Sequence, residues 1–121
     1  MTGFRLAPWL SVRDGAEAVA FYRAAFGADE LYRLDGDAPG EVAVARLSFG
    51  GADFWLQHEP AADPDGSVRM IITSDDPDAL FDRMVAAGAT EVYPMGDDHG
   101  WHIGRVRDPF ADHWEIGRQL G

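Results

Sequence analysis

The residues best suited to chemistry lie in the last predicted strand, His113 to Ile116. Alternation along it places His113 and Glu115 on one face and Trp114 and Ile116 on the other. This is the period-two pattern of a strand with a core face and a face toward a cavity or solvent. Glutamate is a poor strand former unless it is solvated, paired or bound to a ligand. Glu115 is therefore the leading metal or ligand contact, and a solvated face is the alternative.

Other metal ligands must come from histidine, aspartate and glutamate, because the chain has four histidines and no cysteine. One alternative is a shifted cluster of His102, His113 and Glu115 on neighbouring strands. Against it, no pair of histidines has the spacing that presents two imidazoles to one ion from a helix. No Gly-x-Ser-x-Gly elbow surrounds any serine, so a nucleophilic mechanism is unsupported.

The elements that position these residues begin with one strand, one helix and three strands. Asp14 is a suitable helix N-cap, and Gly27 is a natural residue for the positive φ that follows a last helical turn. The expected elements are a strand from Phe4 to Val12, a helix from about Ala16 to Phe26, and strands from Glu30 to Leu34, Glu41 to Phe49 and Asp53 to Glu59.

The same order starts again after a linker rich in proline, glycine and acidic residues, Pro60 to Gly66. Asp75-Asp76-Pro77 caps the second helix, since proline is tolerated in a first turn, and Gly88 ends it. The expected elements are a strand from Val68 to Ser74, a helix from about Pro77 to Ala87, and strands from Glu91 to Pro94, His102 to Val106 and His113 to Ile116.

An internal repeat supports this restart. Residues 18–32 and 79–93 align at a constant offset, and six of 15 positions are identical, including Tyr32 with Tyr93. We predict an α+β fold and a single domain over residues 1–121, built from two βαβββ modules at about 1–60 and 67–121. The sheets are expected to form a concave, partly open barrel-like surface with the helices outside. Each module exposes one sheet face, so the modules must combine within the chain or across a dimer.

Composition narrows the class of protein. At 121 residues and 46% hydrophobic content, the chain is long enough for one domain with a core. A net charge of -11 argues against nucleic-acid and anionic-membrane partners and permits a cationic one. The start of the chain lacks a basic segment followed by an apolar run, and no apolar stretch approaches the ~20 residues that span a bilayer. A cytoplasmic location is expected.

Three segments carry a resemblance to a known family. They are Leu10-Ser11-Val12-Arg13-Asp14, the stretch from Ala20 to Ala28, and the stretch from Arg107 to Glu115. With the paired modules, they resemble the vicinal oxygen chelate superfamily, which includes glyoxalase I, extradiol dioxygenases, fosfomycin-resistance enzymes and bleomycin-resistance proteins. The resemblance covers nearly the whole chain. Ala111 is a departure, because the family usually has glycine there.

The resemblance implies four metal-ligand positions, one on the first and one on the last strand of each module. They fall, within about a residue, on Ala7, Trp55, Arg69 and Glu115. Alanine and tryptophan offer no donor, and arginine is a permanent cation. A single carboxylate does not hold a divalent ion against water. The family's metal centre is therefore expected to be absent, with no cofactor and no catalytic residue in its place.

The residues that replace these ligands predict binding instead of catalysis. Tryptophans supply flat contacts to aromatic or cationic ligands. This pattern resembles the metal-free bleomycin-resistance branch, in which a dimer sequesters a planar cationic drug, and it implies a cytoplasmic homodimer. The alternatives are a glyoxalase-like lyase, isomerase or dioxygenase with the shifted His/Glu site, and a structural remnant with an empty cleft, in which the tryptophans only fill the gap between the modules. The expected ligand-binding residues are Trp9, Trp55, Gln57, Arg69, Trp101 and Glu115.

Overall fold

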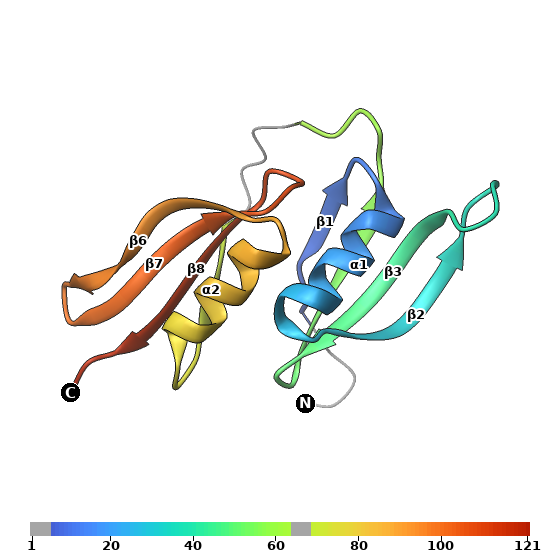
Figure 1. Cartoon of the computed structure of the whole chain (residues 1–121). Coiled ribbons are helices and arrows are strands. Elements are labelled where there is room, and N and C mark those ends of the chain that lie inside the picture. Colours follow the sequence, from blue (N-terminus) through green and yellow to red (C-terminus); the bar gives the residue numbers. More distant parts are fainter. Residues whose placement is uncertain (1–5, 64–68) are drawn as a thin grey trace. The chain divides into compact units, whose positions relative to one another are not determined.

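The computed structural model describes residues 6–63 and 69–121, and the chain divides into two compact units. The first unit extends to Ala62, except that residues 24–26 group with the second unit. Each unit contains one four-stranded sheet and follows the order strand, helix and three strands (Figure 1). The predicted α+β fold of two βαβββ modules is therefore confirmed. No helix within residues 6–63 or 69–121 is long and apolar enough to cross a membrane.

In the first unit the sheet order is β1-β4-β3-β2, so the first strand lies beside the last. The β1–β4 pair is parallel, and the other two pairs are antiparallel. A parallel neighbour requires a crossover, which the helix and two strands between them supply. The elements are β1 (Trp9–Val12), α1 (Gly15–Phe26), β2 (Asp29–Asp35), β3 (Val42–Phe49) and β4 (Ala52–His58).

Helix α1 begins and ends where its capping residues predict. The Asp14 side chain accepts a hydrogen bond from the Glu17 backbone N–H (3.1 Å), and Gly27 adopts a left-handed φ of 69°. Its large apolar residues Val19, Phe21, Tyr22 and Phe26 are buried, and the Tyr22 ring meets Phe54 of β4 edge to face, with centroids 5.2 Å apart. This packing leaves the other face of the sheet available to solvent or a ligand.

The second unit repeats the arrangement with the sheet order β5-β8-β7-β6. Its outer pair β5–β8 is again parallel, which matches the internal repeat in the sequence. The elements are β5 (Arg69–Thr73), α2 (Pro77–Ala87), β6 (Thr90–Asp98), β7 (Trp101–Arg107) and β8 (His113–Gln119).

The turn before β8 is held by the buried carboxylate of Asp108. It accepts hydrogen bonds from the backbone N–H groups of Phe110 (2.9 Å) and Asp112 (3.0 Å) and from the indole N–H of Trp114 (2.8 Å). These bonds determine which side chains of β8 face the core. Ala111 in this turn has a φ of 76°, a left-handed conformation that glycine adopts without strain. This explains why the family that the sequence resembles usually has glycine at this position.

Three strand predictions need correction. Strand β8 continues to Gln119, beyond the predicted end at Ile116. Strand β6 continues to Asp98, beyond the predicted end at Pro94, because the proline falls in a register shift between Tyr93 and Gly96 and so breaks no regular ladder pairing. The first strand begins at Trp9, later than predicted. Residues 4 and 5, Val68 and the end of the predicted linker lie outside the described residues.

Candidate ligand-binding site

A row of aromatic residues crosses the first sheet on the face that α1 leaves open. Strand register aligns Trp9 with Trp55, Trp55 with Arg46, and Arg46 with Tyr32. The two indoles are stacked, with centroids 5.7 Å apart and an interplanar angle of 18°. Tyr32 contacts Trp55 at 5.9 Å, and the Arg46 guanidinium lies 5.7 Å from the Trp55 ring centroid. We call these four residues the aromatic row.

The aromatic row is accessible despite its size. Trp9 is 49% exposed and Tyr32 46% exposed, although large aromatic side chains are usually buried. Arg46 is held by Asp53, which accepts from its Nε (3.0 Å) and also from its terminal nitrogen. The guanidinium charge is therefore already paired. Arg46 acts as a planar support for Trp55.

Gln57 lies one step further along the same face. Its amide Nε2 donates to the hydroxyl oxygen of Ser11 at 2.8 Å. Because β4 alternates, Gln57 and Trp55 share a face while Leu56 between them is fully buried. The first sheet thus brings together three of the predicted residues, Trp9, Trp55 and Gln57.

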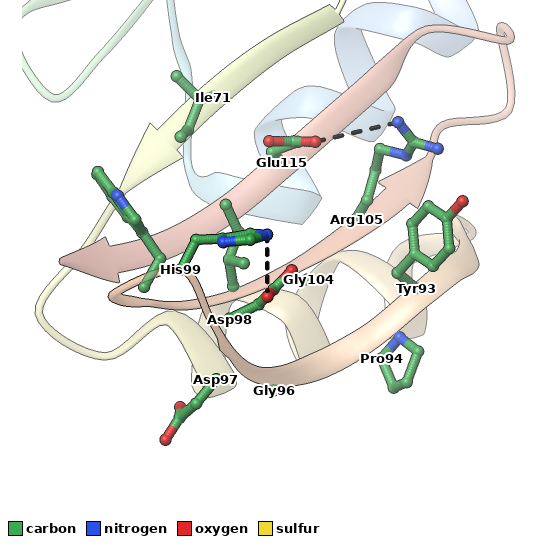
Figure 2. Close-up of a pocket in the computed structure, with 12 residues that line it drawn as sticks. Ile71, Tyr93, Pro94, Gly96, Asp97, Asp98, His99, Gly104, Arg105 and Glu115 are labelled. Carbon is green, nitrogen blue, oxygen red and sulfur yellow. Dashed lines mark ion pairs between the residues drawn. The ribbon is translucent and has the colours of Figure 1, made fainter. Parts of the chain in front are cut away.

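The equivalent row of the second sheet is charged. Register aligns Tyr93 with Arg105, Arg105 with Glu115, and Glu115 with Ile71. The Arg105 guanidinium stacks over Tyr93 at 4.8 Å from the ring centroid and lies 3.9 Å from the Glu115 carboxylate (Figure 2). A second cation, Arg69, is 3.8 Å from the same carboxylate. We call Tyr93, Arg105, Glu115 and Ile71 the charged row.

A cavity of about 640 Å³ opens over the charged row (Figure 2). This volume is in the range of sites for small molecules. Trp101 lines it, so the predicted residues Trp101 and Glu115 share one cavity. Arg69 does not line the cavity but lies 3.8 Å from Glu115. The residues that shape its floor and walls are Ile71, Tyr93, Trp101, Ile103, Arg105 and Glu115.

Positive charge surrounds Glu115. The pKa of neighbouring His113 is lowered by burial and by Arg105, Arg107 and Arg69, so its imidazole is neutral near pH 7. The sequence suggested Glu115 as a negative group for a metal or a cationic ligand. In the structure, two guanidinium groups within 4 Å already compensate that carboxylate.

The shifted cluster of His102, His113 and Glu115 is wrong. His102 lies on the opposite face of β7 from Arg105, where its Nε2 is 3.0 Å from Asp78 of α2 and its Nδ1 is 2.7 Å from Asp97. These two hydrogen bonds raise the His102 pKa. Asp97 is one of the residues that line the cavity, and in Figure 2 its carboxylate points away from Glu115 and Arg105. Within residues 6–63 and 69–121, no three His, Asp or Glu side chains are grouped to hold a metal ion.

Sequence reasoning missed both Tyr–Arg pairs. Tyr32 and Tyr93 are among the identical positions of the repeat, and Arg46 and Arg105 lie opposite them in the two sheets. The repeat is the signal in the sequence that points to these pairs, because both tyrosines are conserved between its two copies. Arg105 in particular faces the cavity and was not among the predicted residues.

Comparison with known proteins identifies relatives of the whole chain. The family model described as the Glyoxalase/Bleomycin resistance protein/Dioxygenase superfamily matches residues 5–116. The uncharacterised protein Mb0911c of Mycobacterium bovis is 35% identical over 95% of this chain and 83% of its own length. The crystal structure of TioX from Micromonospora sp. ML1 superposes with a TM-score of 0.80 at 29% identity, covering 98% of this chain and 100% of TioX. The fosfomycin resistance protein FosX from Listeria monocytogenes shares the fold, with a TM-score of 0.75 at 17% identity over 100% of this chain and 95% of FosX.

Proposed function

Because the chain belongs to the Glyoxalase/Bleomycin resistance protein/Dioxygenase superfamily, we propose that it is a binding protein that sequesters a planar aromatic compound. The observation that carries the proposal is the stacked pair of Trp9, which is half exposed, and Trp55, which is partly buried. Trp9, stacked on Trp55, is 49% exposed and offers an aromatic surface on which a further ring can stack, with Tyr32 5.9 Å from Trp55. A bleomycin-type antibiotic is one compound of this shape.

The energetics favour a binding role for this surface. An aromatic pair contributes about 0.5–1.5 kcal/mol beyond the area that it buries. The indole of Trp55 is fixed by Trp9 on one side and by Arg46, itself held by Asp53, on the other. A ligand ring therefore meets side chains that are already ordered, so little conformational entropy is lost on binding.

The proposal includes no metal, no cofactor and no catalytic residue. Of the four positions implied by the family resemblance, only Glu115 carries a metal donor, and it lies between two arginines. Zinc, nickel, manganese or iron should therefore not raise the melting temperature, because an ion that does not bind the native state cannot stabilise it. A metal-dependent rise that disappears in Glu115→Ala contradicts the metal-free part of the proposal.

Calorimetric titration tests the proposal with two planar probes, uncharged 2-naphthamide and cationic bleomycin. We expect at least one to bind. Trp55→Ala should weaken the binding of that probe by roughly 1–3 kcal/mol, which is the effect of removing a well-packed aromatic anchor. Leu31→Ala is the matched control, because it removes an exposed apolar side chain outside the aromatic row. Binding of neither probe, or equal affinity in both variants, contradicts the proposal.

A further inference from the structure

The two modules contain the same Tyr–Arg pair in two different electrostatic settings. In the first module, Arg46 pairs with Tyr32 across the strands, and its Nε donates to Asp53 at 3.0 Å. Asp53 lies two residues before Trp55 on β4. In the second module, the residue two positions before Glu115 on β8 is His113. The repeat thus retains the arginine and replaces its carboxylate partner with an imidazole.

The guanidinium of Arg105 consequently keeps unused donors. Its Nε is buried and has no hydrogen-bond partner among the residues that the structure describes. Its contact with Glu115 is 3.9 Å, longer than a hydrogen bond. Stacking over Tyr93 at 4.8 Å holds the guanidinium plane in position without using any N–H group. A buried donor without a partner indicates a group that is missing from the site.

The unpartnered N–H group and the positive charge of Arg105 favour an anion as that missing group. Three arginines, Arg69, Arg105 and Arg107, act on His113, and Glu115 is the carboxylate placed between two of them. Of the acidic residues at the cavity, Asp98 is 3.4 Å from His99, and Asp97 is bonded to His102. A guanidinium matches the two oxygens of a carboxylate with parallel N–H groups.

The walls of the cavity define the rest of the ligand. Tyr93 and Trp101 supply aromatic surface, and Ile71 and Ile103 supply aliphatic surface, around a volume of about 640 Å³. Such a lining suits a ring attached to the anionic group, since apolar walls with a few polar contacts are typical of small-molecule sites.

We propose that the cavity on the second sheet recognises the carboxylate of an aromatic acid, with Arg105 as the group that binds it. The inference rests on the proposed function, because Trp101 and Glu115 belong to the same predicted binding residues, and it specifies the ligand as an anion. It differs from the sequence-based expectation of a cation. The overall charge of -11 lowers the affinity for any anion, so the local arginines must overcome it.

NMR of the isotope-labelled wild-type protein tests the site directly. The Nε–Hε signal of Arg105, identified by its loss in Arg105→Gln, is followed during titration with benzoate and with uncharged benzamide. We expect benzoate to shift the Arg105 signal and to raise the pKa of His113, because an anion beside an imidazole favours its protonated form. An Arg105 signal that does not move with benzoate, or moves equally with benzamide, overturns the inference.

Two variants measure how much Arg105 contributes to the affinity for an aromatic acid. Arg105→Gln should lower the affinity for 2-naphthoate by about tenfold or more, as expected for loss of a charge-assisted hydrogen bond. Arg118→Gln, which makes the same change of charge on the opposite face of β8, should leave the affinity within about twofold. Equal affinity in the two variants overturns the inference.

The two proposals fail separately. If 2-naphthamide and 2-naphthoate bind equally and both depend on Trp55, the aromatic row binds ligand and the carboxylate site is refuted. If benzoate shifts Arg105 and Trp55→Ala has no effect on any probe, the carboxylate site is supported and the aromatic row is refuted.

Discussion

Asp112 provides a test of the packing around β8. Its side chain is buried, its Oδ2 has no hydrogen-bond partner among the described residues, and it lies in the turn that Asp108 organises. Burial, and then the nearby Asp108 charge, raise the Asp112 pKa from 3.8 to about 7. Two buried carboxylates in one turn do not both ionise easily. Asp108 accepts three N–H donors, so Asp112 is the one that retains its proton.

The sign and size of the contribution of Asp112 to stability follow from the linkage between protonation and folding. The folded protein binds a proton at Asp112 more tightly than the unfolded chain, so stability falls as pH rises from about 4 to about 7 and is constant above that range. A difference of about 3 pKa units at roughly 1.4 kcal/mol each gives an upper limit of about 4 kcal/mol. Solvent screening at the turn reduces this to about 2 kcal/mol.

Asp112→Asn keeps the shape of the side chain and abolishes its titration. We expect the variant to be more stable than the wild type by about 2 kcal/mol near pH 8 and nearly equal to it near pH 4. Urea unfolding across this pH range measures the difference, in which the contributions of His102 and His113 cancel because both proteins contain them. Asp37→Asn, in an exposed loop, is the control. A difference between Asp112→Asn and wild type that does not change with pH would refute the reasoning.

Three further predictions concern the fold and the assembly. Asp108→Ala should cost about 3–5 kcal/mol of unfolding free energy, because it leaves the buried Trp114 indole N–H and two backbone donors unpaired, and a cost below about 1 kcal/mol by urea unfolding contradicts this. Gly15→Ala should cost about 2 kcal/mol or more, since its Cβ would lie 2.4 Å from the Val42 carbonyl oxygen, and an unchanged melting temperature contradicts it. Light scattering should give about twice the 13.2 kDa chain mass, because each sheet exposes one face, and the mass of a monomer contradicts the predicted homodimer.

Local signals in the sequence predicted the elements well. Helix α2 has the predicted bounds, Pro77–Ala87, because a capping aspartate, a first-turn proline and a following glycine fix both ends. The extent of β6 was underestimated because a proline is read as a strand end. Whether it ends the strand depends on pairing with β7, which local sequence does not specify.

The candidate site was harder to predict, because it depends on register and strand phase. The open faces of β4 and β8 followed from alternation, so Trp55 and Glu115 were assigned correctly to them. The contact of Arg105 with Glu115 requires the pairing of β7 with β8, and the opposite orientation of His102 requires the phase of β7. The sequence predicted Glu115 as an isolated carboxylate, whereas in the structure it lies at the centre of an ion-pair network with two arginines.

The indole N–H signals of the tryptophans test the central claim most directly. During titration of isotope-labelled protein with whichever of 2-naphthamide and bleomycin binds in calorimetry, we expect the signals of Trp9 and Trp55 to shift together, because a stacked ring changes the local magnetic field at both indoles. The signal of Trp114 should not move, because that indole is buried and donates to Asp108 at 2.8 Å. Signals of Trp9 and Trp55 that stay fixed at saturating probe contradict the account.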